Sequence, residues 1–180
     1  MFSTTVVATF PSVICNSCMS KVYSLKTVQV LPVTLEKAWD FFSNPANLSA
    51  ITPPHMEFRI VSKHQGSRMY AGQIIEYKVK PLPGLPMYWM TEITHVADKQ
   101  FFVDEQRFGP YSLWHHQHHF REVKGGVEMT DIVHYKIPFW IFGDIANVLF
   151  VRRQLDSIFR YRFEAVERLF GKKEAEALKS

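Results

Sequence analysis

Apolar and polar residues alternate along most of the chain after residue 56, in runs separated by turn-forming residues. Because side chains along a strand point alternately to the two faces of a sheet, this alternation predicts strands with one buried face. Pairs such as Asp98-Lys99 and Gly125-Gly126 between the runs suit hairpins, which favours an antiparallel meander. The predicted strands are 57–64, 69–80, 87–97, 101–108, 112–123 and 126–138.

The chain before this meander begins with a strand and then changes to a helical period. Residues 22–31 alternate like a strand. Thr34 is a favoured N-cap for the short amphipathic helix that follows, and Asn44-Pro45 ends it. A second short helix is predicted over 46–51.

The last predicted element is a long helix over 144–170. Apolar residues recur there at spacings of three and four and form a stripe about 40 Å long. The stripe consists of Ile145, Val148, Leu149, Leu155, Ile158, Phe159, Phe163, Val166, Leu169 and Phe170. The predicted fold class is therefore α+β, with about seven antiparallel strands, two short helices after the first strand and a long C-terminal helix.

The composition indicates a globular chain with one domain. Of its 180 residues, 47% are hydrophobic and 14% are aromatic, which is enough to build a core without disulfides. We expect one ligand-binding domain over 20–171, an N-terminal extension at 1–19 and a polar tail at 172–180. We interpret the extension as a disordered arm or as the product of a start site upstream of the natural one.

Several functional classes receive little support from the sequence. The CxxC motif of Cys15 and Cys18 lacks the second ligand pair or the strand-to-helix setting of metal and redox sites. No apolar run reaches the ~18 residues of a membrane-spanning helix, so we expect no integral membrane segment and a cytoplasmic location. The net charge of +4 comes from scattered residues without a nucleic-acid-binding motif, so no nucleic acid partner is expected. These patterns leave the oligomeric state open.

Four segments carry a family resemblance: VDEQRFGPY (103–111), WHHQHHF (114–120), MTDIVHYKIPF (129–139) and IFRYRF (158–163). Together with the order of the elements, they resemble a bacterial ligand-binding branch of the START-like (SRPBCC) superfamily, which includes birch pollen allergens and polyketide cyclases. The resemblance covers almost everything after residue 19. It implies a helix-grip fold, a curved sheet closed around the C-terminal helix with a small hydrophobic ligand between them. It also implies no metal and no cofactor.

Strand parity predicts a polar patch on the inner face of this sheet. In the last predicted strand, Asp131 and Tyr135 share the face of the apolar residues. In the strand before it, Trp114 and Phe120 define the inner face, which then includes both His116 and His118.

The register of the preceding strand decides which carboxylate joins these histidines. A three-residue turn places Gln106 opposite Trp114 and Asp104 opposite His116. A two-residue turn brings Glu105 to the inner face instead. With the three-residue turn, the expected ligand-binding residues are Trp89, Asp104, Gln106, Trp114, His116, His118, Asp131 and Tyr135.

Three interpretations of the polar residues stay open. They form a satisfied buried pair, because an unpaired buried polar group costs about 1–3 kcal/mol, or they contact a ligand carbonyl or hydroxyl, or they are catalytic. Asp104, His116 and His118 are also residue types that can bind a metal, but the resemblance implies no metal. Arg152 and Arg162 are expected on a solvated face of the long helix, although one of them could pair with Asp131 or a ligand carboxylate.

The favoured function is the binding of a small apolar molecule, such as a lipid, isoprenoid or polyketide, between sheet and helix. The alternative is an aromatase or cyclase in which His116 or His118 is the general base and Asp104 orients the ring. No residue is assigned as catalytic beyond these candidates. A further alternative is an interaction protein whose cavity is filled by aromatic side chains. Motifs of hydrolases, kinases and dinucleotide-binding enzymes are not found in the sequence.

Overall fold

The computed structural model describes residues 22–62, 68–82, 85–138 and 144–172. The predicted N-terminal extension with its two cysteines, and the polar tail beyond residue 172, lie outside the described residues.

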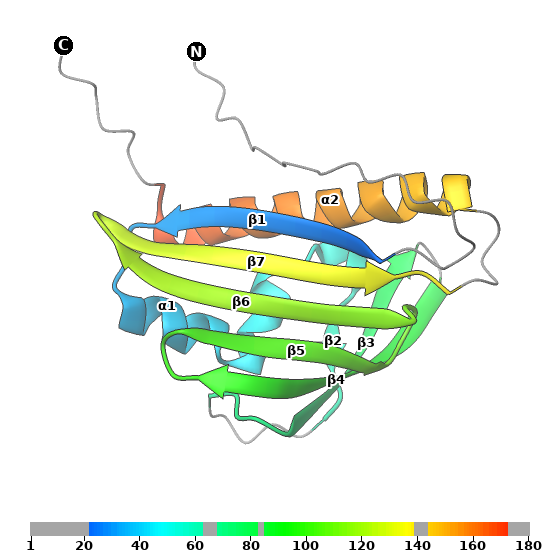
Figure 1. Ribbon diagram of the computed structural model, residues 1–180, viewed down its shortest axis with the longest axis horizontal. Helices are drawn as coiled ribbons and strands as arrows, with labels where there is room; N and C mark the ends of the chain where they lie inside the picture. Colours follow the sequence, from blue (N-terminus) through cyan, green and yellow to red (C-terminus); the bar gives the residue numbers. More distant parts are fainter. Residues whose placement is uncertain (1–21, 63–67, 83–84, 139–143, 173–180) are drawn as a thin grey trace, which may run out of the picture.

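The described chain forms one seven-stranded antiparallel sheet in the order β1-β7-β6-β5-β4-β3-β2. Each strand from β2 to β7 pairs with the next one in the chain, which confirms the predicted meander, and β1 closes the sheet against β7 (Figure 1). The strands are β1 (Tyr23–Leu31), β2 (Arg59–Ile60), β3 (Gln73–Leu82), β4 (Leu85–Ala97), β5 (Phe101–Phe108), β6 (Leu113–Val123) and β7 (Gly126–Lys136).

Two strands differ from the pattern of the sequence. The strand predicted at 57–64 is reduced to β2 in the described residues. Of the proline-rich segment 81–86, predicted as a loop, Pro81 and Leu82 end β3, and Leu85 and Pro86 begin β4. A register shift between Val79 and Leu82 places Pro81 in an irregular stretch of the ladder, which suits a residue that has no N–H to donate.

Short helices follow β1, as predicted. In α1 (Leu35–Phe42), the Thr34 side chain accepts a hydrogen bond from the backbone N–H of Lys37 at 3.3 Å. This N-cap satisfies one of the free N–H groups at the start of the helix. The second helix, η1 (Pro45–Ile51), is of the 3₁₀ type, and a further short turn, η2 (Pro54–Met56), follows it.

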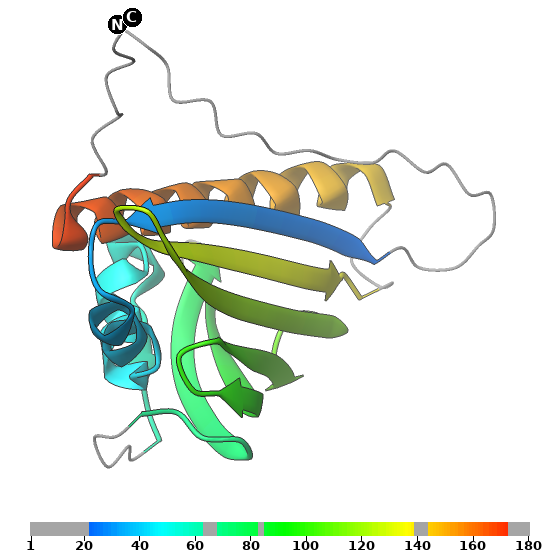
Figure 2. The same cartoon turned by 60° about the vertical axis from the view of Figure 1, so that its left-hand side comes forward.

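The long helix α2 (Asp144–Phe170) spans the open side of the curved sheet. Figure 2 shows α2 running along the β1 side of the sheet, with α1 and η1 closing one end of the interior. This arrangement confirms the predicted α+β helix-grip architecture. Within the residues that the structure describes, no helix has the length and apolar character needed to cross a membrane.

An aromatic core joins α1 to the sheet. The Trp39 ring packs edge-on against Phe102 at 6.0 Å and Phe120 at 5.4 Å between ring centroids. Ala165 and Val166 of α2 belong to the same buried cluster. Because these side chains bury large apolar areas, they fix the C-terminal half of α2 against the inner face of the sheet.

Candidate functional site

A cavity of about 530 Å³ lies between the inner face of the sheet, η1 and α2. Its walls are mostly apolar and aromatic, and they include Leu48, Ile75, Val79, Trp89, Trp114 and Phe159. A cavity of this size is in the usual range for small-molecule sites, and it counts against the hypothesis of an interior filled by aromatic side chains.

Five ionisable side chains form a cluster at one wall of this cavity. Asp104, His116, His118 and Arg162 line the cavity, and Asp131 lies behind the two histidines. Their side chains are only 5–16% exposed. They come from β5, β6, β7 and α2, so segments far apart in the sequence assemble the cluster.

The two imidazole rings lie between the two carboxylates. His118 Nε2 is 2.9 Å from Asp104 Oδ2, and His118 Nδ1 is 2.8 Å from Asp131 Oδ1. His116 Nε2 lies 3.0 Å from the same Asp131 oxygen, whereas His116 Nδ1 is 3.5 Å from Asp104 Oδ2. The separation of 3.5 Å exceeds the usual length of an N–H···O hydrogen bond. The two rings are tilted by 39° to each other, with 3.8 Å between their centroids.

Arg162 is the side chain in this cluster whose placement the sequence did not predict. Its Nη2 atom lies 3.4 Å from Asp131 Oδ1 and 3.3 Å from His118 Nδ1. Only 12% of the side chain is exposed, so the expected solvated position is wrong. In the sequence, Arg162 lies near the broad apolar stripe of this helix. A residue there can face either solvent or the sheet.

The environments of the two histidines shift their pKa values in opposite directions. Burial lowers the pKa of His116, and the neighbouring charge of His118 lowers it further. Burial also opposes the charge of His118, but its hydrogen bonds to Asp104 and Asp131 outweigh this effect and raise its pKa. The physical difference is that His118 meets a carboxylate at both nitrogens and His116 at one.

Both carboxyl groups remain ionised although they are buried. Burial acts against the charge of Asp131, but the positive charge of Arg162 and the bonds from the two histidines hold its pKa well below the usual range. Burial likewise acts against the charge of Asp104, and the adjacent His116 and His118 lower its pKa overall. The cluster is thus a set of paired charges rather than of neutral acids.

A pair of hydroxyl groups extends the polar wall across β3 and β4. Tyr77 Oη and Thr91 Oγ1 are 2.8 Å apart, and both residues line the cavity. Burial and the charge of Asp104 raise the pKa of Tyr77, which keeps its hydroxyl neutral. This pair was not identified in the sequence, because Tyr and Thr are ordinary strand residues.

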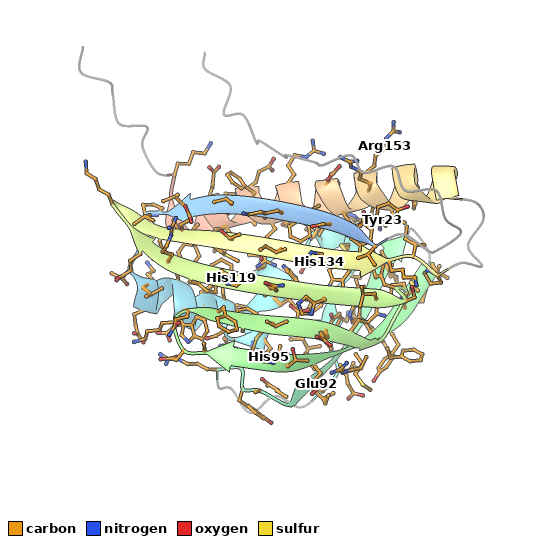
Figure 3. The ribbon with its side chains drawn as sticks, in the orientation of Figure 1. Tyr23, Glu92, His95, His119, His134 and Arg153 are labelled. Atoms are coloured by element: carbon orange, nitrogen blue, oxygen red, sulfur yellow. The ribbon has the colours of Figure 1, made fainter. Side chains whose placement is uncertain are left out.

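The register between β5 and β6 settles which carboxylate faces inward. Asp104 pairs with His116, as the three-residue turn predicts, and Glu105 pairs with His115. The Glu105 side chain bonds to His115 Nδ1 at 2.9 Å on the other face of the sheet. Figure 3 shows His95, His119 and His134 on the same outer face, so the histidines of this sheet divide between two surfaces.

Three of the expected ligand-binding residues lie outside the described cavity lining. Gln106 instead holds the β5–β6 turn, with Nε2 donating to the backbone carbonyl of Tyr111 at 2.6 Å and Oε1 accepting from its N–H at 3.2 Å. Asp131 lies behind the histidines, and Tyr135 is buried in a cluster with Leu25 and Val133. Trp89 and Trp114 do line the cavity, and their rings meet edge to face at 5.4 Å between centroids.

Asp104, His116 and His118 are also residue types that bind metals, and one potential ligand atom of each lies within 4.8 Å of the others. However, each ring directs one nitrogen towards Asp104 and the other towards Asp131. A tetrahedral metal site needs lone pairs that converge on one point. We therefore assign hydrogen bonds and ion pairs, not metal ligation, to this cluster.

Solved structures share this arrangement of sheet and helix. CV1439 from Chromobacterium violaceum has a TM-score of 0.62 at 11% identity, covering 83% of this chain and 98% of that chain. The major latex-like protein 151 from Panax ginseng has a TM-score of 0.60 at 12% identity, covering 83% and 97%. Ara h 8.0201 has a TM-score of 0.58 at 14% identity, covering 83% and 98%.

No protein-family model and no curated protein matches the chain. The structural likenesses are at low identity, so they bear on the fold and not on the ligand. The strand order, the C-terminal helix and these likenesses agree with the resemblance seen in the sequence. The chain therefore has a helix-grip fold, as these solved structures do.

Proposed function

We propose that the protein binds a small, mainly apolar molecule, such as a lipid, an isoprenoid or a polyketide, in the cavity between the sheet and α2. The observation that carries this proposal is an apolar cavity of about 530 Å³ with a polar cluster at one wall. Ligand sites typically combine apolar walls with a few polar groups that fix orientation.

The two parts of the cavity have different roles in this proposal. The apolar walls provide affinity, at about 25 cal/mol for each Å² of apolar surface removed from water. The cluster residues Asp104, His116 and His118 orient the ligand by hydrogen bonds. Trp89 and Trp114 supply broad contact surfaces for the apolar body.

Native mass spectrometry of the protein purified from its source organism, followed by organic extraction, tests this function. We expect a reproducible small molecule with a long apolar part in the extract. Repeated preparations that carry no such molecule, together with no binding of the neutral apolar dye N-phenyl-1-naphthylamine, would contradict the proposal.

A pair of matched variants links the binding to the cavity. Val79 is 4% exposed and lines the cavity, so Val79→Phe fills part of the space. Val28 is 48% exposed on β1, and Val28→Phe adds the same side chain at the surface. We expect dye affinity to fall by about tenfold, or ~1.4 kcal/mol, for Val79→Phe alone. Equal affinities of the two variants would place binding elsewhere.

A second candidate function is acid–base catalysis on a bound carbonyl compound, as in an aromatase or cyclase. The observation that favours it is the pair of adjacent histidines whose pKa values are shifted apart, His116 downward and His118 upward. Such a pair offers a neutral base beside a charged acid. His116 would take a proton from the carbon next to a carbonyl, and His118 would donate to the carbonyl oxygen.

Deuterium exchange tests the catalytic candidate without a known substrate. With 2-decanone in D₂O, we expect the protein to speed exchange at the carbons next to the carbonyl, and His116→Asn to abolish that acceleration while dye binding persists. His119→Asn, on the outer face, is the matched control. Equal exchange with and without the protein would reject catalysis but leave the binding function standing.

A further inference from the structure

The protonation of the polar cluster follows from its geometry. Both nitrogens of His118 lie within 2.9 Å of a carboxylate oxygen, one from Asp104 and one from Asp131. A nitrogen without a proton would place its lone pair against those oxygens. Arg162 Nη2 also lies 3.3 Å from Nδ1, but Asp131 Oδ1 is nearer at 2.8 Å, so both nitrogens carry protons and His118 is an imidazolium. The raised pKa of His118 agrees with this assignment, burial opposing it and the two carboxylates outweighing burial.

His116 is neutral by the same argument. Its Nε2 atom donates to Asp131 Oδ1 at 3.0 Å. Its Nδ1 atom is 3.5 Å from Asp104 Oδ2, beyond normal hydrogen-bond length, and so needs no proton there. The charged ring of His118, whose centroid lies 3.8 Å away, further disfavours a second positive charge.

The cluster as a whole is therefore electrically neutral. The negative charges of Asp104 and Asp131 are matched by the positive charges of Arg162 and His118. The other ionisable groups among the described lining residues are tyrosines, and burial raises the pKa values of Tyr77 and Tyr111. A ligand carboxylate placed against this wall would find no unpaired positive charge there. A buried unpaired charge is strongly unfavourable.

The wall instead offers hydrogen bonds to a neutral group. Asp104 Oδ2 accepts from His118 at 2.9 Å and lies 3.5 Å from His116, and a carboxylate has about four lone-pair sites. Because Asp104 lines the cavity with 16% of its side chain exposed, it can accept a further hydrogen bond from a ligand. A ligand hydroxyl can donate to Asp104, and the neutral hydroxyl pair of Tyr77 and Thr91 also lines the cavity.

We infer that the cavity selects neutral amphiphiles that carry a hydroxyl group at one end, and that it rejects the corresponding carboxylates. This inference rests on the proposed binding function and names the class of ligand for the same cavity. In the wild-type protein, Asp104 already occupies the place opposite His118 that a ligand carboxylate would need.

Displacement of N-phenyl-1-naphthylamine by three ten-carbon ligands near neutral pH tests the inference on the wild-type protein. The ligands are 1-decanol, methyl decanoate and decanoate, which differ in charge and in the presence of an O–H donor. We expect decanol to bind most tightly, the neutral ester less tightly and decanoate at least about tenfold more weakly than decanol, equivalent to ~1.4 kcal/mol. Decanoate binding as tightly as decanol would overturn the inference.

A charge-altering variant tests the same point independently. Asp104→Asn removes the carboxylate opposite His118, and a ligand carboxylate can then take its place. We expect the affinity of decanoate relative to decanol to rise by at least about tenfold, again ~1.4 kcal/mol. Glu92→Gln changes the total charge by the same amount on the outer face of β4 (Figure 3), and keeps the wild-type ratio; Glu92 pairs there with Arg107.

The outcomes separate the two proposals. If the dye does not bind the wild-type protein, or if no ligand displaces it, the binding function fails. If the dye binds and is displaced but Asp104→Asn and Glu92→Gln show the same ligand preference, the assignment of selectivity to the cluster is wrong. If Asp104→Asn does not fold, the order of the three ligands on the wild-type protein still decides the inference.

Discussion

His118 of β6 and Asp131 of β7 are direct partners across the sheet, and His118 Nδ1 lies 2.8 Å from Asp131 Oδ1. Each residue is inward-facing and buried, so the sheet brings a charged pair into its own interior. A buried ion pair is tolerated only when its remaining hydrogen-bonding atoms are also satisfied. Asp104 and Arg162 provide those partners and explain why the pair is stable where it lies.

We predict that Asp131→Asn destabilises the fold by about 3–5 kcal/mol, because it leaves Arg162 buried without its carboxylate partner and His118 with Asp104 alone. Urea denaturation measures the free energy of unfolding. The control is Glu128→Gln on the same strand, whose partner Arg121 is largely exposed, and its effect is about 0–1 kcal/mol. A similar loss in both variants would contradict the assigned role of Asp131.

The two inner histidines are predicted to contribute to stability with opposite pH dependence. His118 has a raised pKa, because its bonds to the carboxylates outweigh burial. Its contribution is fully present below the unfolded pKa of about 6.5 and is lost as the pH rises through the folded pKa. His116 has a pKa lowered by burial and by His118. Its contribution is present above about 6.5 and is lost as the pH falls through the folded pKa.

Unfolding free energies of His118→Gln and His116→Gln across pH measure these contributions. We expect the cost of His118→Gln, relative to wild type, to shrink as the pH rises and the cost of His116→Gln to shrink as the pH falls. Histidine NMR titration gives a direct check, with His118 titrating at the higher pH. The same direction of change in both variants would show that the protonation states are assigned incorrectly.

Gln106 is predicted to act on stability and not on ligand affinity. Gln106→Ala removes both side-chain bonds to the Tyr111 backbone, and we expect a loss of about 1–3 kcal/mol from the unfolding free energy. Dye affinity of the folded variant stays at the wild-type value. Gln117→Ala is the control, because Gln117 bonds to His115 and His119 on the outer face. A folded Gln106→Ala protein with reduced dye affinity would restore Gln106 to the ligand site.

Gly126 is predicted to be essential for pairing β7 with β1. A Cβ atom on Gly126 would lie 1.9 Å from the backbone oxygen of Leu31, at a φ of +146°. We expect Gly126→Ala to cost more than about 3 kcal/mol, because steric overlap and backbone strain each cost ~1–3 kcal/mol. Gly72→Ala is the matched control, with positive φ but no atom within 4 Å of the added Cβ. Thermal unfolding separates the two, and equal losses would exclude the steric explanation.

Much of the candidate site could be predicted from the alternation of apolar and polar residues along the strands. The alternation in β6 and β7 placed His116, His118 and Asp131 on the buried face, and the structure buries all three. The choice between Asp104 and Glu105 depended on the length of a single turn, because a shift of one residue exchanges the faces of a strand. For Gln106, correct parity was not enough, since its side chain turns back to bond with the adjacent loop.

The sequence by itself determined the order of strands and helices, and it indicated which residues share the inner face of the sheet. Periods of two and of 3.6 residues are local properties of strands and helices, and burial follows from them. Only the tertiary structure decided that Arg162 meets Asp131 and that each imidazole lies between two carboxylates. Those contacts depend on strand register and on how α2 docks across the sheet, and both join residues far apart in the chain.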